Sequence, residues 1–446
     1  MPPVAIQYSD LQLLHDLFCR TAESFDVFDP HKRLSQNIKT ITKKGSDCQF
    51  NLSANGYHGQ KAMKFYFGKN RWEKGKKFIY INNPDGTMRW LIPAANHEPS
   101  HLALYNAESL KARIYKSVSR LLFRAGLGKW LGTSAFYVEQ NLEKDVKRLY
   151  RIHDDEQYVV FTGTRGNNRK VVLAISNGAM VTHFIKIPIS KKSQELIENE
   201  TNMLKQLSKY DFTTLSIPRV TDSRIKAYTR LTNVKPATTI SAQRINDIHI
   251  RALTEIYSFS HERKAIAECA AWQTVVNNME WMQREHTLSN GLDEFKARRV
   301  LHLLNKLYHT LNTGEAIPVS VSHGDFTPWN MYCDENRLYV YDWELSENGI
   351  PMLFDLYHFI FQSQVMVQHQ NYTNIRQSIK DTVKKHNVQR LVNKYRIDTG
   401  LHYQLYLMFN ISYYMRLYIE EKELLTQSHW MVDAWMDALE DVNKVK

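Results

Sequence analysis

Hydrophobic and polar positions alternate along residues 61–93, which predicts β-structure in the first part of the chain. Three segments show this period of two, and turn-forming Gly, Asn, Asp and Pro residues separate them: KFYFG, KFIYI and MRWLI. We expect a small antiparallel sheet here. Before it, apolar residues at helical spacing over residues 8–22 predict a short helix.

Residues 106–132 combine apolar residues at helical spacing with basic residues at other positions, which predicts a basic amphipathic helix. Such a helix can lie on an anionic membrane surface, or its apolar face can pack on its own domain. Both alternatives stay open at this point. The apolar positions are Leu110, Ile114, Val118, Leu121, Leu122 and Ala125, and the basic ones are Lys111, Arg113, Lys116, Arg120, Arg124 and Lys129.

A second β-rich stretch covers residues 158–232, and a mainly helical pattern follows it. Three strands are predicted in YVVFT, RKVVLAIS and MVTHFIKIPI, then a helix over Ser193–Lys209, then two strands in IPRVT and KAYTRLT. Helical periodicity dominates from Ile245 to the end, apart from β-like runs in VSVSHGD and RLYVYDWE. The pattern therefore predicts an α+β protein whose β-rich parts precede a helical part.

Length and composition indicate a globular protein with more than one folding unit. A chain of 446 residues is too long for one ordinary core, and 43% of its residues are hydrophobic. The four cysteines are scattered singly, without the spacing of a zinc cluster or a disulfide framework, so we expect reduced thiols. We find neither a signal peptide nor a run of about 20 apolar residues, so we expect a soluble, cytoplasmic protein.

The positive charge of the chain is concentrated near its start. The formal net charge is +12, and residues 1–150 alone carry 23 lysines and arginines against 13 aspartates and glutamates. This asymmetry is typical of a region that meets an anionic partner, such as membrane lipid, acidic glycan or nucleic acid, but it also fits an ordinary solvated surface. Aromatic residues interleave with the basic ones and could stack on bases, yet a sheet with an aromatic core and a basic rim explains the same pattern. We therefore do not expect a nucleic-acid partner, and an anionic membrane face stays a candidate.

The most informative motif is Ser-His-Gly-Asp-Phe-Thr-Pro-Trp-Asn, which ends at Asn330 and is followed by the strand-like run Leu-Tyr-Val-Tyr-Asp-Trp-Glu. Phosphoryl transfer needs a carboxylate beside the attacking hydroxyl group and oxygen ligands for the Mg²⁺ that binds the phosphates. Asp325, Asn330 and Asp342 are residues of these types. A loop between short strands can bring the first two together, and the apolar strand delivers the third.

These motifs resemble the catalytic loop and metal-binding segment of the aminoglycoside phosphotransferase and choline kinase family, whose fold is related to that of protein kinases. The resemblance implies a two-lobe fold, with a small β-rich lobe over residues 151–240 and a large, mainly helical lobe over residues 241–446. Residues 1–150 would form an extra N-terminal α+β region without a counterpart in the family. ATP and Mg²⁺ are the cofactors that the resemblance implies.

The resemblance also implies roles for individual residues. Asp325 would be the catalytic base, Asn330 and Asp342 would bind the metal, and His323 and Asp355 would support the loop. Gly324 would permit a backbone angle that other residues avoid. Lys186 would bind nucleotide phosphates and pair with Glu200, and the hairpin turn with Gly163 and Gly166 would cover the phosphates.

The leading hypothesis is a kinase that phosphorylates a hydroxyl group of a small molecule. The candidate acceptors are a sugar, an aminoglycoside, an amino alcohol and an intermediate of surface-glycan biosynthesis. One alternative is a nucleotide-binding scaffold without activity, which could dispense with the base or the metal ligands. Another is a protein whose basic N-terminal region binds membrane or nucleic acid as its main function. The sequence carries no signal for the oligomeric state.

Overall fold

The computed structural model describes residues 38–44, 47–52, 63–67, 75–83, 86–96, 102, 110–125, 134–163, 168–178, 180–224, 227–235, 240–241, 243–284, 292–420 and 426–444. The helix predicted over residues 8–22 lies outside these ranges. The chain divides into two compact units. Unit 1 comprises residues 1–201 and 219–233, and unit 2 comprises residues 202–218 and 234–446.

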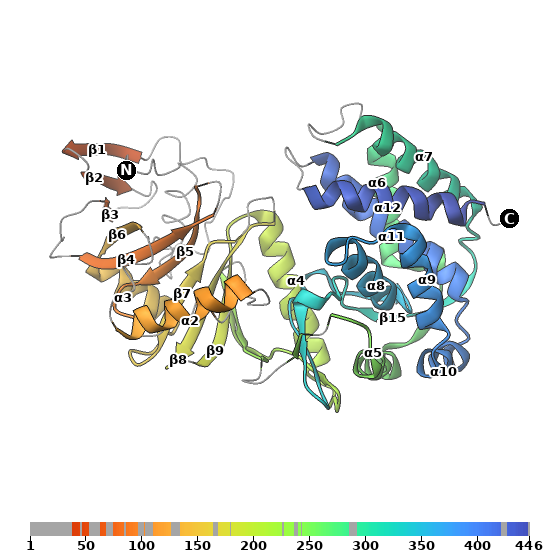
Figure 1. Ribbon diagram of the computed structural model, residues 1–446, viewed down its shortest axis with the longest axis horizontal. Coiled ribbons are helices and arrows are strands. Elements are labelled where there is room, and N and C mark those ends of the chain that lie inside the picture. The colour runs from red at the N-terminus through yellow and green to blue at the C-terminus, as the bar shows by residue number, and fades with distance from the viewer. Residues whose placement is uncertain are drawn as a thin grey trace. The chain divides into compact units, whose positions relative to one another are not determined.

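The described strands of unit 1 form one antiparallel sheet of eleven strands (Figure 1). Its order is β1-β2-β3-β6-β4-β5-β7-β8-β9-β12-β11. The strands before residue 150 are β1 Ile38–Lys44, β2 Asp47–Leu52, β3 Met63–Phe67, β4 Gly75–Asn82, β5 Met88–Pro93 and β6 Ser134–Glu139. Those after it are β7 Gln157–Phe161, β8 Lys170–Asn177, β9 Met180–Pro188, β11 Val220–Arg224 and β12 Tyr228–Thr232.

The N-terminal strands and the later strands meet at β5 and β7. Trp90 of β5 pairs with Phe161 of β7, and Leu91 pairs with Val160, so the sheet continues without a break between the two regions. Strand β6 lies between β3 and β4 and pairs with both, a connection that the local pattern did not predict. The predicted domain boundaries at residues 150 and 240 stay predictions. Strands β5 and β7, which lie on either side of residue 150, are paired by hydrogen bonds.

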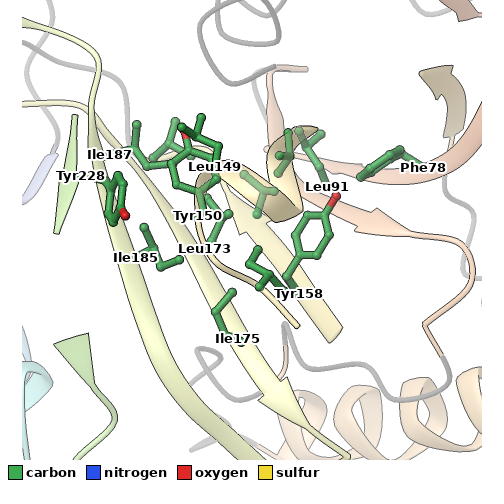
Figure 2. Close-up of a cluster of buried hydrophobic side chains, with 14 of the residues drawn as sticks. Phe78, Leu91, Leu149, Tyr150, Tyr158, Leu173, Ile175, Ile185, Ile187 and Tyr228 are labelled. Atoms are coloured by element: carbon green, nitrogen blue, oxygen red, sulfur yellow. The ribbon is translucent and has the colours of Figure 1, made fainter. Parts of the chain in front are cut away.

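A hydrophobic core on one face of the sheet also joins the two regions (Figure 2). Phe78 and Leu91 from the N-terminal strands are fully buried with Tyr158, Leu173 and Ile185 from the later strands. Helix α3, Gln140–Leu149, supplies further side chains to the same core. Because both regions bury apolar surface against each other, each depends on the other for its stability.

The opposite face of the sheet carries a second core, to which helix α2, Leu110–Arg124, contributes Phe123. Side chains alternate between the two faces of a strand, so Phe78 lies in the first core and its neighbour Ile79 in the second. Helix α2 lies within the predicted range of residues 106–132. It contacts the sheet core through Phe123 and exposes Ile114, Val118 and Leu121 of the predicted apolar stripe.

Unit 2 is mainly helical and contains two small sheets (Figure 1). Its described helices are α5 Asp247–Ser260, α6 Ala270–Arg284, α7 Glu294–Thr310, α8 Phe354–Met366, α9 Tyr372–Val383, α10 His386–Tyr395, α11 Thr399–Glu420 and α12 Thr426–Val442. One sheet has the order β10-β17-β16-β13, with β10 Leu215–Ser216, β13 Ile240–Ser241, β16 Met331–Cys333 and β17 Leu338–Val340. The other has the order β14-β15-β18, with β14 Glu262–Ala265, β15 Ala316–Ser322 and β18 Glu347–Pro351.

Most predicted elements are confirmed within the described residues. The strands predicted between residues 64 and 92 are β3, β4 and β5, and those predicted between residues 158 and 189 are β7, β8 and β9. The helix predicted over Ser193–Lys209 is α4, Lys191–Leu207. Cys269 and Cys333 are buried free cysteines. None of the described helices has the length and apolar character needed to cross a membrane.

Candidate active site

In unit 1, Lys186 and Glu200 form a buried ion pair. The ammonium nitrogen of Lys186 lies 2.8 Å from Oε1 and 2.6 Å from Oε2 of Glu200. Lys186 is 8% exposed and Glu200 is fully buried, so each charge depends on the other for the interactions it lost with water. The structure therefore brings together the two residues that the sequence predicted as a pair.

Local sequence signals set the geometry of this pair. Strand β9 holds Lys186 between Val172 of β8 and Thr229 of β12. Helix α4 begins after Ser190, whose hydroxyl oxygen accepts a hydrogen bond of 3.0 Å from the backbone N–H of Ser193, as a capping residue does. The hydroxyl groups of Thr201 and Thr229 lie 2.8 Å apart and tie the helix to the sheet one residue after Glu200.

The predicted phosphate-covering turn follows β7. Gly163 has a φ of +76°, and a Cβ atom there would lie 2.2 Å from the carbonyl oxygen of Lys170, so only glycine fits this position. Gly166, the second predicted glycine of the turn, lies outside the described residues. The backbone at the start of the turn is therefore constrained to glycine. The role of the turn in phosphate binding stays a prediction.

In unit 2, Asp355 anchors the start of the loop over residues 323–330. It lies in the first turn of α8 and is 2% exposed. Its carboxylate accepts hydrogen bonds from the hydroxyl of Ser322 at 2.8 Å, from the N–H of His323 at 2.8 Å and from the N–H of Gly324 at 3.1 Å. These donors fix the chain where it leaves β15, so Asp355 determines the direction in which the loop begins.

His323 and Gly324 hold the loop against the segment that follows β17. Nδ1 of His323 accepts a hydrogen bond of 3.2 Å from the N–H of Asp325, and Nε2 lies 3.0 Å from the carbonyl oxygen of Tyr341. Both ring nitrogens of this buried histidine are therefore engaged in bracing the loop. Gly324 has a φ of +81°, and a Cβ atom there would lie 2.1 Å from the carbonyl oxygen of Leu345. The backbone angle predicted for this glycine, which other residues avoid, is therefore confirmed.

The carboxylate of Asp325 is held from two sides. Oδ2 accepts a hydrogen bond of 2.8 Å from Nδ2 of Asn330, and Oδ1 lies 3.2 Å from Nε2 of His358. The Asp325 side chain nevertheless stays 26% exposed. A carboxylate offers about four lone-pair sites, so acceptor sites remain for a substrate proton after these two contacts. The arrangement fixes the position of the Asp325 carboxylate and leaves it accessible.

Asn330 and Asp342 are joined through the hairpin of β16 and β17. Met331 pairs with Val340, and the N–H of Tyr341 donates to the carbonyl oxygen of Asn330 at 3.0 Å, so Asp342 follows directly after this contact. Asp342 has a φ of 67°, in the left-handed region that aspartate tolerates better than most residues. Such a conformation in a non-glycine residue is often found at functional sites.

The residue types at this hairpin fit a magnesium ion. Both contacts of Asn330 with Asp325 use its amide nitrogen, and its carbonyl oxygen is the atom that can bind a cation. A carbonyl oxygen and the carboxylate of Asp342 are hard ligands of the kind that Mg²⁺ takes together with phosphate oxygens. Among the described residues, no three His, Cys, Asp or Glu side chains gather as metal ligands.

His358 is a site residue that the sequence analysis missed. It is fully buried on α8, one helical turn after Asp355, and reaches the carboxylate of Asp325. The spacing of three residues on a helix offers the signal that could have found it, because residues at i and i+3 lie on the same face. Asp355 and His358 thus hold the loop from one helix face. Asp355 contacts the backbone at the start of the loop, and His358 contacts the side chain of Asp325.

Comparison with known proteins identifies the region that contains these residues. Residues 157–368 match the model of the phosphotransferase enzyme family. This range includes Lys186, Glu200, the loop over residues 323–330, Asp342 and all of α8, whereas β1 to β6 lie before it. No curated protein matches the chain.

Several solved structures are similar to the chain at low sequence identity. A thermostable mutant of an aminoglycoside phosphotransferase, in complex with ADP and hygromycin B, has a TM-score of 0.42 and 12% identity over 68% of this chain and 98% of its own. Another aminoglycoside phosphotransferase, in complex with GDP and kanamycin, has a TM-score of 0.42 and 10% identity, with coverages of 69% and 99%. A choline/ethanolamine kinase family protein from Mesorhizobium loti has a TM-score of 0.37 and 9% identity, with coverages of 60% and 84%.

The family match falls on the same residues that the geometry singles out. It spans strand β9 with Lys186, helix α4 with Glu200, and the loop that carries Asp325. The α+β fold, with a sheet-rich unit and a helical unit, agrees with the kinase-like architecture that the sequence predicted. Through residues 157–368, this chain is similar to the phosphotransferase enzyme family, and this match supports a small-molecule phosphotransferase.

Proposed function

We propose that the protein is an ATP- and Mg²⁺-dependent kinase that transfers the γ-phosphoryl group to a hydroxyl of a small molecule. The observation that carries this proposal is the accessible carboxylate of Asp325, which Asn330 and His358 hold in one position. A fixed, partly exposed carboxylate is the group that can orient a hydroxyl and accept its proton. The acceptor classes are those of the sequence analysis: sugars, aminoglycosides, amino alcohols and surface-glycan intermediates.

In the proposed reaction, the acceptor hydroxyl donates a hydrogen bond to Asp325, which points its oxygen toward the γ-phosphorus. As the new P–O bond forms, the bond between the γ-phosphorus and the bridging oxygen breaks, and ADP leaves with that electron pair. The hydroxyl proton passes to a carboxylate oxygen of Asp325. His323 takes no part in proton transfer, because both its nitrogens brace the loop.

The remaining roles follow from residue chemistry. Lys186, held by Glu200, would neutralise the nucleotide phosphates, and Asn330 and Asp342 would hold the metal. When bound, Mg²⁺ would reduce the negative charge of the phosphates and favour their departure from the γ-phosphorus. The protein's own contribution is thus positioning and charge, without a covalent intermediate on the enzyme.

The test of this function is a screen for acceptor-dependent ADP release with the full chain, ATP and Mg²⁺, over a panel of sugars, aminoglycosides and amino alcohols. With an active acceptor, Asp325→Asn should lower turnover by at least about 100-fold, the scale of a lost base, while ATP affinity stays close to that of the wild type. Asp211→Asn, an exposed aspartate of unit 2, is the matched control. Half or more of the activity remaining in Asp325→Asn would exclude it as the base.

A calorimetric titration separates the metal assignment from the base assignment. Asp342→Ala should remove the Mg²⁺ dependence of ATP binding, because the variant loses the carboxylate ligand. Asn330→Ala should have a smaller effect, since it removes a neutral oxygen. Equal Mg²⁺ dependence in the wild type and in Asp342→Ala would contradict the assignment of Asp342. ATP binding without transfer to any acceptor in the panel would favour the nucleotide-binding scaffold.

A further inference from the structure

Helix α2 presents an exposed apolar stripe. Ile114, Val118 and Leu121 are 55%, 47% and 70% exposed, and their spacings of four and three residues place them on one side of the helix. Large aliphatic side chains are common on surfaces as single residues, whereas a row of three on one helix face is a contiguous patch. We refer to these three residues as the α2 stripe.

The α2 stripe is not needed to hold the helix on unit 1. Phe123, which is 3% exposed, packs in the second core with residues of the sheet, and Ser119 is fully buried. Phe123 lies about half a helical turn from Leu121 around the axis, so the helix buries one side and exposes the other. The fold therefore explains the position of α2 but not the apolar character of its outer side.

The charged positions of α2 are all basic. Between Leu110 and Arg124 the helix contains five basic residues and no acidic one. Arg120 and Arg124 are exposed, one residue before and three residues after Leu121. The five basic residues are Lys111, Arg113, Lys116, Arg120 and Arg124. An exposed aliphatic row beside cationic side chains is the pattern of a helix that lies at the surface of an anionic membrane.

We propose that the outer side of α2 docks the protein on an anionic lipid surface. The α2 stripe inserts among the acyl chains near the headgroups, and the arginines contact lipid phosphates. Two other partners fit the surface less well. Nucleic acid is disfavoured because the exposed row is aliphatic and offers no ring for base stacking. A second copy of the chain is disfavoured because a two-fold contact would bring two like-charged helix faces together.

Docking does not depend on the proposed reaction, because the α2 residues lie before the range that matches the phosphotransferase family. The net charge of residues 1–150 has the same sign as that of α2, so the surrounding region adds to the attraction. Attachment of this kind would concentrate the enzyme at a membrane and favour acceptors that are themselves at a membrane.

The experiment is cosedimentation of the full chain with vesicles of pure phosphatidylcholine and with vesicles that also contain phosphatidylglycerol. The wild type should bind the anionic vesicles at least about 10-fold more strongly, and added salt should reduce the difference. Replacing the α2 stripe in the variant Ile114→Ser/Val118→Ser/Leu121→Ser should lower binding to anionic vesicles by at least about 10-fold, because the apolar contribution is lost. Arg120→Gln/Arg124→Gln should lower it by about 5-fold for each charge removed.

The controls are Phe295→Ser, which removes an exposed aromatic residue of unit 2, and Lys384→Gln, which removes an exposed charge there. Both should bind vesicles as the wild type does. The proposal is overturned if the wild type does not prefer anionic vesicles, or if the stripe variant binds as well as the controls. It is also overturned if the stripe variant changes the oligomeric state in light scattering, since a second copy would then cover the stripe. A lower thermal stability of the stripe variant would overturn it too, since this chain itself would then cover the stripe.

Discussion

The two units handle buried polar groups in different ways. Unit 1 places opposite charges in pairs: the buried Lys186 with Glu200, and Arg230 with the partly exposed Glu156 at 3.5 Å. Unit 2 buries the carboxylate of Asp355 against uncharged donors and buries His402, whose Nδ1 lies 2.8 Å from the carbonyl oxygen of Met352. A low-dielectric interior permits both solutions, because each supplies the interactions that water no longer provides. The difference predicts that the stability of unit 1 is sensitive to the loss of one member of an ion pair. The stability of unit 2 should be sensitive to acid and to the loss of a hydrogen-bond acceptor.

The largest expected effect comes from breaking the buried pair of unit 1. Glu200→Ala should lower the free energy of unfolding by about 3 to 5 kcal/mol, because the buried ammonium group of Lys186 loses the carboxylate that it contacts. The double variant Lys186→Met/Glu200→Leu should recover most of this stability and still fail to bind ATP. Urea unfolding and calorimetry measure the two quantities.

The control for this pair is Glu280→Ala, which breaks the exposed ion pair with Arg284 and should cost less than about 1 kcal/mol. If the double variant were no more stable than Glu200→Ala alone, the burial of an unpaired charge would not explain the loss. If it bound ATP with wild-type affinity, Lys186 would have no role in nucleotide binding.

The next largest effect comes from removing Asp355, the buried hydrogen-bond acceptor of unit 2. Asp355→Ala should lower the free energy of unfolding by about 2 to 3 kcal/mol, because the buried donors of Ser322, His323 and Gly324 lose their acceptor. Turnover should fall as well, since the loop that carries Asp325 loses its anchor. Asp381→Asn, an exposed aspartate, serves as control. A variant with wild-type stability would show that the loop needs no anchor at this position.

Acid should weaken unit 2 through its buried histidines. Burial lowers the pKa of His402 to about 4, and burial, followed by the charge of Lys385, does the same for His249. In the unfolded chain a histidine titrates near the ordinary value of 6.5, so between these values the unfolded state binds more protons than the folded state. The contribution is fully present above about pH 6.5 and is lost as the pH falls toward about 4.

Removing one of these histidines tests whether it contributes to the loss of stability at low pH. His402→Gln should reduce the loss of unfolding free energy between about pH 7 and about pH 5 by about 2 kcal/mol, relative to the wild type. His386→Gln, at an exposed position, should leave the pH dependence unchanged. Urea unfolding at both pH values gives the comparison. An identical slope in the wild type and in His402→Gln would contradict a lowered pKa at His402.

The smallest expected effect is that of His358, which positions Asp325. His358→Gln keeps a side-chain N–H donor, and His358→Leu removes it. His358→Leu should lower kcat by about 10-fold with little change in KM, because the base is less well fixed while acceptor contacts remain. His358→Gln should restore part of this loss. Equal kcat values in both variants would indicate a packing role for His358 rather than a hydrogen bond to Asp325.

Much of the candidate site could be predicted from the sequence because its residues lie in short motifs. His323 to Asn330 form one loop, and a hairpin brings Asp342 back to it, so local connections alone bring these groups close together. Lys186 and Glu200 lie on a strand and on the helix that directly follows it. The contact of His358 with Asp325 was missed because it joins residues 33 positions apart, and no local pattern shows which side of α8 meets the loop.

What the sequence by itself determined is the local structure: strand alternation, helix caps, the glycine at a positive φ and the order of residue types in the catalytic loop. Only the tertiary structure decided that the N-terminal strands continue the sheet of the family domain through β5 and β7. It also decided that α2 buries Phe123 and exposes Ile114, Val118 and Leu121. The physical reason is that strand pairing and helix docking depend on surfaces far apart in the chain, whereas propensity and periodicity describe only neighbours.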